Sequence, residues 1–158
     1  NENNLEKIIN NIVGDAIVKE VMSLKLAVKL IETVEEKAAE MGLAVVVAVS
    51  DASGRPIAVH CMDGAYHGSF DVAVNKTYTS TAFQMSTAKL SRLCQPGQDL
   101  YGLQFSNNGK VMILGGGEPL MVGKTMIGAL GVSGGSAQED SDLAAYGASA
   151  LKEVIKCL

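Results

Sequence analysis

Residues 115–135, GGGEPLMVGKTMIGALGVSGG, alternate short apolar runs with glycines, and this pattern is typical of consecutive antiparallel strands. The tight Gly123-Lys124 turn predicts a β-hairpin between two extended runs, residues 119–122 and residues 125–132. A third apolar run, residues 110–114, comes directly before the three glycines. We therefore predict a meander of three strands, in which the glycines serve as turns and as points of close packing.

Two parts of this stretch imitate nucleotide-binding loops. The run from Gly117 to Thr125 ends in GKT, but five residues separate its glycines where a P-loop has four, and it continues into a strand instead of a helix. The run from Gly128 to Gly135 has GxxG spacing instead of GxGxxG, and acidic residues open the helix that follows it. Those carboxylates complement the helix dipole and oppose a pyrophosphate, so we expect no nucleotide site.

Upstream of the meander, cap and turn signals separate helices from strands. Ser23 is a predicted N-cap for a helix that ends at Gly42. The Val-rich run at residues 44–50 predicts a strand buried on both faces, and a short turn connects it to a second strand at residues 56–62. These two strands are expected to form an antiparallel hairpin.

Three further helices complete the prediction. Ser69 is expected to cap a helix that runs to about residue 84, and a shorter helix follows from Ser86-Thr87 to Cys94. The last helix is expected over residues 138–156. Hairpins without a βαβ alternation favour an α+β domain, a single antiparallel sheet flanked by helices in the order α, ββ, αα, βββ, α.

Helical spacing of apolar residues also occurs at residues 3–13, before the first capped helix. The chain is long enough for one domain of ordinary size and too short for two independent cores. We predict an N-terminal helical extension at residues 1–22 and a single domain at residues 23–158.

Composition excludes several classes of function. The formal net charge of −4, without a basic run, argues against a nucleic-acid partner. We expect no membrane span, no signal peptide and a cytoplasmic location. The cysteines are three and widely spaced without a CxxC pair, so neither a disulfide framework nor a zinc site is indicated.

Few residues suggest catalytic chemistry. His60 and His67 are the only histidines, so an imidazole ligand must be one of them. Cys61 cannot form a dyad with His60, because neighbouring residues on a strand point to opposite faces. The run Gly131-Val132-Ser133-Gly134-Gly135 has the spacing of a GxSxG motif, but we expect no elbow-like strand-to-nucleophile geometry there. We predict no catalytic residue set, whereas a haem or corrinoid, which needs one or two axial donors, stays possible.

Several motifs follow one another along the chain: Met62-Asp63-Gly64-Ala65, Lys76-Thr77-Tyr78-Thr79, Gln95-Pro96-Gly97, Leu100-Tyr101-Gly102, Gly115-Gly116-Gly117-Glu118-Pro119-Leu120 and Ile127-Gly128-Ala129-Leu130-Gly131-Val132-Ser133-Gly134-Gly135 with Asp140. Together these motifs closely resemble the GlcG/HbpS family, and in particular the C-terminal domain of PduO and its stand-alone relatives. The resemblance covers about residues 24–151 in order.

The resemblance implies a profilin-like fold with a five-stranded antiparallel sheet, assembled into dimers or higher homo-oligomers. It also implies a non-catalytic module that binds haem or a corrinoid in support of coenzyme B12-dependent diol and glycerol metabolism, with partner proteins from that metabolism. The alternatives are a homo-oligomeric scaffold or regulatory subunit without a cofactor, and, third, a small-molecule or haem-degrading enzyme. The expected cofactor-binding residues are His60, His67, Met62, Asp63, Gly64, Lys76, Gly116, Gly117 and Pro119, with His60, His67 and Met62 as axial candidates in that order.

Overall fold

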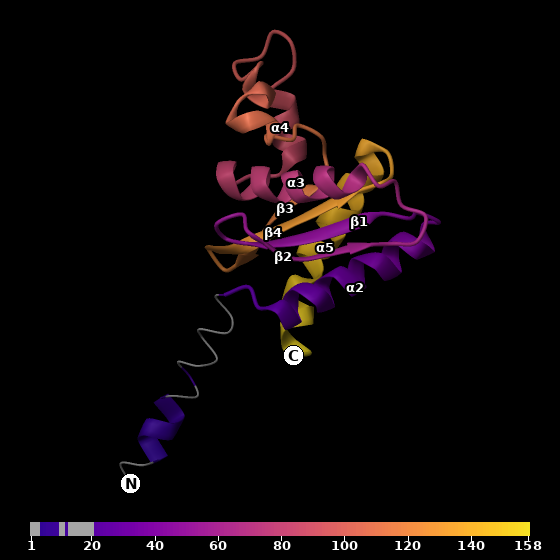
Figure 1. Ribbon diagram of the computed structural model, residues 1–158. Coiled ribbons are helices and arrows are strands. Elements are labelled where there is room, and N and C mark those ends of the chain that lie inside the picture. The colour runs from indigo at the N-terminus through magenta and orange to yellow at the C-terminus, as the bar shows by residue number, and fades with distance from the viewer. Residues whose placement is uncertain (1–3, 10–11, 13–20) are drawn as a thin grey trace.

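A computed structural model describes residues 4–9, residue 12 and residues 21–158 (Figure 1). The helices are α2 (Leu24–Glu40), α3 (Ser69–Phe83), α4 (Thr87–Leu93) and α5 (Ala137–Lys156), with two short 3-10 turns, η1 (Leu103–Phe105) and η2 (Asn107–Gly109). The strands are β1 (Val46–Asp51), β2 (Pro56–Cys61), β3 (Gly117–Val122) and β4 (Thr125–Ser133).

The strands form one antiparallel sheet in the order β2-β1-β4-β3, with a helical layer on each face (Figure 1). Helices α2 and α5 pack together against one face, where Val47, Val49 and Leu130 join the largest apolar cluster. Helix α3 covers the other face, where Ala73 packs against Val46 and Ala48. Strand β1 is therefore buried on both faces, as its Val-rich run predicts.

Glycines in β4 let α3 lie directly on the sheet. A Cβ atom on Gly131 would collide with the backbone carbonyl of Ala73 in α3, and one on Gly128 would collide with the carbonyl of Ser50 in β1. Gly123 has φ +60° at the tip of the β3–β4 hairpin, a conformation that glycine adopts without strain. These positions act as close-packing points and a turn, as predicted.

The helix ends confirm one predicted N-cap and correct another. The Ser23 side chain accepts a hydrogen bond from the backbone N–H of Leu26 at 3.1 Å, as expected for an N-cap. The prediction for Ser69 was wrong, because Gly68 is the N-cap of α3 and Ser69 lies buried inside its first turn. Helix α5 begins at Ala137 behind a capping box that Ser136 and Glu139 form.

The prediction of five strands was wrong, because the sheet of the described chain has four. Residues 111–114 approach α3 and form no ladder: the N–H of Met112 donates to Oγ1 of Thr79 at 2.8 Å, and that hydroxyl contacts the carbonyl of Lys110 at 3.3 Å. Val111 is buried against Leu90 and Cys94. The apolar character of this run serves a small cluster beneath α4 and not a strand.

The predicted helix at residues 3–13 lies partly outside the described residues. Within it, the structure describes residues 4–9 and residue 12, and these are helical. No helix in the described ranges is long and apolar enough to cross a membrane.

Candidate functional site

The residues that the sequence nominates do not gather in one pocket. They separate into a histidine–carboxylate contact beside β2, an exposed loop after β2, a buried polar cluster under β3, and a cleft at the opposite edge of the sheet. Each of these places has its own geometry.

His60 lies on β2, an edge strand, and faces α2. Its Nδ1 atom lies 2.9 Å from Oε1 of Glu35, and the His60 side chain is 36% exposed. Since the carboxylate accepts a hydrogen bond, Nδ1 carries the proton, and in the neutral imidazole Nε2 keeps a free lone pair. Metal-ligating histidines are commonly held by such a carboxylate, which fixes the ring and increases its basicity. His60 therefore fits the role of an iron ligand.

The loop after β2 carries the other nominated residues of this region. Met62 is half-buried and packs against the cluster between the sheet and helices α2 and α5. Asp63, Gly64 and His67 are exposed, and Gly64 has φ +83° in a turn. His67 has no carboxylate anchor in the described structure. The loop thus offers a second imidazole that is less well oriented than His60.

Lys76 and Asp140 form a buried ion pair between α3 and α5. The Lys76 ammonium donates to the carbonyl of Val132 at 2.6 Å and to Oδ2 of Asp140 at 3.1 Å. Burial lowers the pKa of Lys76, and the charge of Asp140 partly offsets this effect. Oδ1 of Asp140 accepts from the N–H of Gly135 at 2.8 Å. The pair has no exposed face, so we assign it to the architecture.

Gly116 and Gly117 allow the chain to pass this cluster. A Cβ atom on Gly116 would lie 2.6 Å from the carbonyl oxygen of Val132 and 2.8 Å from the Lys76 ammonium. The N–H of Gly117 donates to Oγ1 of Thr87 at 2.8 Å, which ties β3 to α4. Both glycines are therefore packing positions and line no open site.

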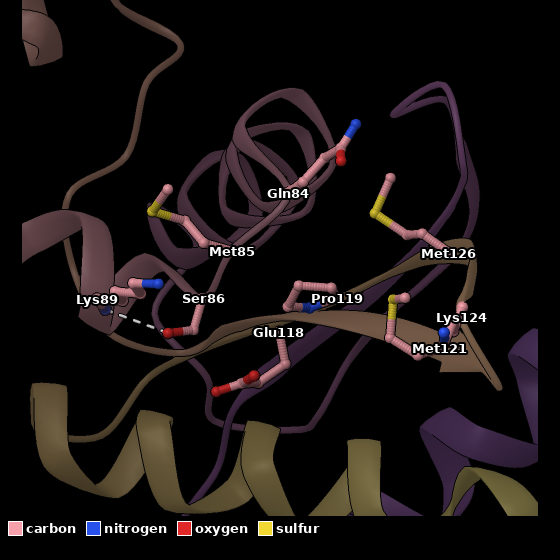
Figure 2. Close-up of a pocket in the computed structure, with 9 residues that line it drawn as sticks. All are labelled: Gln84, Met85, Ser86, Lys89, Glu118, Pro119, Met121, Lys124 and Met126. Carbon is pink, nitrogen blue, oxygen red and sulfur yellow. Dashed lines mark hydrogen bonds between the residues drawn. The ribbon is translucent and has the colours of Figure 1, made fainter.

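Pro119 lies in a cleft of about 660 Å³ (Figure 2). One wall is the turn between α3 and α4, and the other is the β3–β4 hairpin. The lining consists of three methionines, two lysines and a few polar groups: Gln84, Met85, Ser86, Lys89, Glu118, Pro119, Met121, Lys124 and Met126. Sequence reasoning found only Pro119 here.

Some of the site residues that the sequence analysis did not name could have been predicted from local patterns, and others could not. Met121 and Met126 flank the Gly123-Lys124 turn, so a hairpin there already predicts that they pair across the strands, as they do. Glu35 gave no signal, because only the fold brings it to His60, 25 residues further on. Among the described residues, no cluster of three or more histidine, cysteine or acidic side chains could hold a metal ion.

The sequence matches the family described as "Haem degrading protein HbpS-like" over residues 22–149, and the chain belongs to this family. It is 39% identical to an uncharacterized 15.0 kDa protein in the dhaT-dhaS intergenic region of Citrobacter freundii, over 78% of this chain and 87% of that protein. It is also 39% identical to the corrinoid adenosyltransferase PduO of Salmonella typhimurium over 69% of this chain, but it spans only 32% of PduO.

Solved structures agree with this assignment. The Klebsiella pneumoniae protein ORFY superposes with a TM-score of 0.80 at 36% identity, covering 83% of this chain and 90% of that chain. A crystal structure described as a PduOC–haem complex gives a TM-score of 0.78 at 35% identity, with coverage of 82% and 94%. HbpS gives a TM-score of 0.74 at 26% identity, with coverage of 83% and 90%. The α+β fold with an antiparallel sheet is shared, and haem binding occurs in the family.

Proposed function

We propose that this chain is a haem-binding module in which His60 supplies an axial ligand. The observation that carries the proposal is the 2.9 Å contact between Nδ1 of His60 and Glu35, which leaves Nε2 free at a partly exposed edge of the sheet. A relative of 35% identity is described in complex with haem, which supports the choice of ligand. When bound, the iron would supply ligand-binding or redox chemistry tuned by this donor.

Each residue has a defined part in this proposal. Glu35 holds the proton on Nδ1 of His60 and fixes the plane of the ring. Met62 and His67 follow in the next loop as the remaining donor candidates. Asp63 and Gly64 shape that loop, while Lys76, Gly116 and Gly117 support the sheet beneath it.

A hemin titration of the purified chain, followed by the Soret band, tests this function. We expect His60→Ala to shift the band and His67→Ala to leave it unchanged. Glu35→Ala should weaken hemin binding about 10- to 100-fold, the range found when such supporting carboxylates are removed. Glu32→Ala on the exposed face of α2 is the matched control and should behave like the unaltered chain. Absence of any Soret change in the unaltered chain contradicts haem binding. If both histidine variants keep the spectrum of the unaltered chain, histidine ligation is contradicted.

A corrinoid is the alternative cofactor in the same proposal. The likeness to part of PduO and to a protein from the dhaT-dhaS region supports a role beside coenzyme B12-dependent diol and glycerol metabolism. The chain matches only about a third of PduO, so the adenosyltransferase activity is not transferred to it. A cobalamin titration beside the hemin titration distinguishes the two ligands.

An exposed apolar surface favours a second candidate, a homo-oligomeric scaffold or regulatory subunit. Tyr101, Phe105 and Leu114, in or beside the loop between α4 and β3, are 57%, 77% and 49% exposed. Large apolar side chains left exposed in one segment are candidates for a protein–protein interface. Light scattering that shows an oligomer, with no thermal shift from hemin or cobalamin, would favour the scaffold over the cofactor module.

A further inference from the structure

The cleft between the α3–α4 turn and the β3–β4 hairpin has no part in the proposed haem site. It lies at the β3 edge of the sheet, whereas His60 lies on β2, the opposite edge. Two strands, β1 and β4, separate the two places. A molecule held in the cleft therefore does not touch His60 of the same chain.

Methionines make part of both walls of the cleft apolar and adaptable. Met121 and Met126 are cross-strand partners in the hairpin, and Met85 lies on the opposite wall beside the start of α4 (Figure 2). Met121 is 46% exposed, although it is a large apolar side chain. Methionines are flexible and polarisable, and they occur often where a surface must fit an apolar ligand.

Two cations accompany these apolar walls. Lys89 reaches the cleft from α4 and Lys124 from the tip of the hairpin, and neither forms an ion pair within the described part of the chain. The Glu118 carboxylate, the only acidic group of the lining, points away from the methionine side chains (Figure 2). The cleft thus combines an apolar interior with two ammonium groups that are free to pair with an anion.

Gln84 adds a polar group at the cost of backbone strain. It caps the end of α3 with φ 53°, a left-handed conformation for which glycine is the favoured residue. The residue at this position is a glutamine, and its side chain lines the cleft (Figure 2). A strained position on a cavity wall suggests a function for that side chain beyond ending the helix.

We propose that this cleft is a binding site for a small organic anion with an apolar body, in chemical class a medium-chain carboxylate. Met85, Met121 and Met126 contact the apolar body. Lys89 and Lys124 lie at opposite ends of the lining (Figure 2) and together give the cleft a positive potential that attracts the carboxylate, and the Gln84 amide can donate a hydrogen bond to it. The site is independent of the haem site proposed above.

Methionine methyl NMR with octanoate as the probe tests the site directly. The chain has seven methionines, so a sample labelled at the methionine methyl carbons gives one signal from each. We expect saturable shifts for Met85, Met121 and Met126, while Met22, Met41, Met62 and Met112 serve as internal controls. Octan-1-ol has the same apolar body without the charge and should bind more weakly. Shifts spread over all seven methyls, or shifts at none, overturn the proposal.

Substitutions then separate binding from folding. Gln84→Gly should weaken octanoate binding about two- to tenfold, the effect of one hydrogen bond, with an equal or higher Tm. Asn108→Gly, at another left-handed position with φ 56° away from the cleft, is the control that should leave binding unchanged. Lys89→Gln and Lys124→Gln should each weaken octanoate binding about two- to fivefold, and Lys25→Gln on the exposed face of α2 should not.

Two results of these assays would refute the proposed site. Equal affinity for octanoate and octan-1-ol, with no effect of either cleft lysine, shows that the cleft does not recognise the anion. Displacement of octanoate from the three methionines by hemin shows that the cleft is the haem slot and no separate site. A chain that fails to bind hemin but gives the three expected shifts contradicts the haem function alone.

Discussion

Asp140 shows how a single side chain connects distant parts of this molecule. Its carboxylate accepts from the Lys76 ammonium on α3 and from the N–H of Gly135 just before α5. Both ends of the ion pair are almost fully buried, with 1% and 6% of their side-chain surfaces exposed. Removal of one partner leaves the other charge buried without compensation, which is more costly than loss of the pair as a whole.

Asp140→Ala should therefore destabilise the fold by about 3–5 kcal/mol, measured as the free energy of unfolding in urea. The double variant Lys76→Met, Asp140→Ala should lose less than the sum of the two single variants, because it removes both charges together. Asp142→Ala, two residues further along α5 and exposed, should change stability by about 0.5 kcal/mol or less. Equal losses for Asp140→Ala and Asp142→Ala would contradict the structural role of the pair.

Glu118 makes stability depend on pH in the opposite sense to most paired carboxylates. Burial raises its pKa above the usual 4.5, so ionisation is less favourable in the folded than in the unfolded chain. Below about pH 4.5 the carboxyl is protonated in both states, and its contribution to the free energy of unfolding is fully present. This contribution is lost as the pH rises towards the folded pKa, and it stays lost at higher pH. Glu118→Gln should therefore raise the Tm at pH 7 and leave it unchanged at pH 3.5. A larger gain at pH 3.5 than at pH 7 would contradict the burial of this carboxyl.

The attachment of β3 to helices α3 and α4 depends on the absence of a side chain at Gly117. A Cβ atom there would lie 2.6 Å from Cγ2 of Thr87 and 2.8 Å from both the Lys76 carbonyl oxygen and Oγ of Ser80. Gly117→Ala should cost about 1–3 kcal/mol of unfolding free energy by overpacking. Gly68→Ala is the matched control, since neither glycine has a positive φ and nothing lies within 4 Å of a Cβ at Gly68. A loss at Gly68 as large as that at Gly117 would show that clashes are not the cause.

Elements with signals inside their own sequence were predictable. The run of valines in β1 and the Ser23 cap of α2 needed only local rules, and both are confirmed. The Gly123-Lys124 turn likewise fixed the β3–β4 hairpin and the pairing of Met121 with Met126. Local rules therefore predict the β3–β4 hairpin, which is one wall of the cleft, but they do not predict that its methionines line a cleft.

Features that depend on distant partners were not predictable. Residues 110–114 are apolar enough for a strand, but the hydroxyl of Thr79, some thirty residues earlier, binds this segment instead. The partners Lys76 and Asp140 are 64 residues apart. No periodicity carries information on such pairs, so the sequence nominated Lys76 as a cofactor-binding residue where the fold uses it in the core.

At the scale of the whole chain, residues 22–149 match the family and the preceding segment lies outside that match. We propose that the domain begins at Met22, one residue before the predicted boundary, and that residues 1–21 are an N-terminal extension. Removal of residues 1–21 should therefore change the Tm by about 1 °C or less, because Met22 is the first buried apolar residue of the described core. A loss of cooperative unfolding in this deletion would show that the extension is part of the domain.

The two proposed ligand sites lie at opposite edges of one sheet, and this arrangement predicts that they act independently. A ligand that binds only the folded state stabilises it by an amount set by its concentration relative to its Kd. Two ligands that share no contact and induce no common change have a coupling factor of about 1. Hemin should therefore leave the Kd of octanoate unchanged, and the two ligands together should raise unfolding free energy by the sum of their separate effects. We expect this additivity in urea unfolding at saturating hemin with and without octanoate, and competition between the two ligands would place them in the same site.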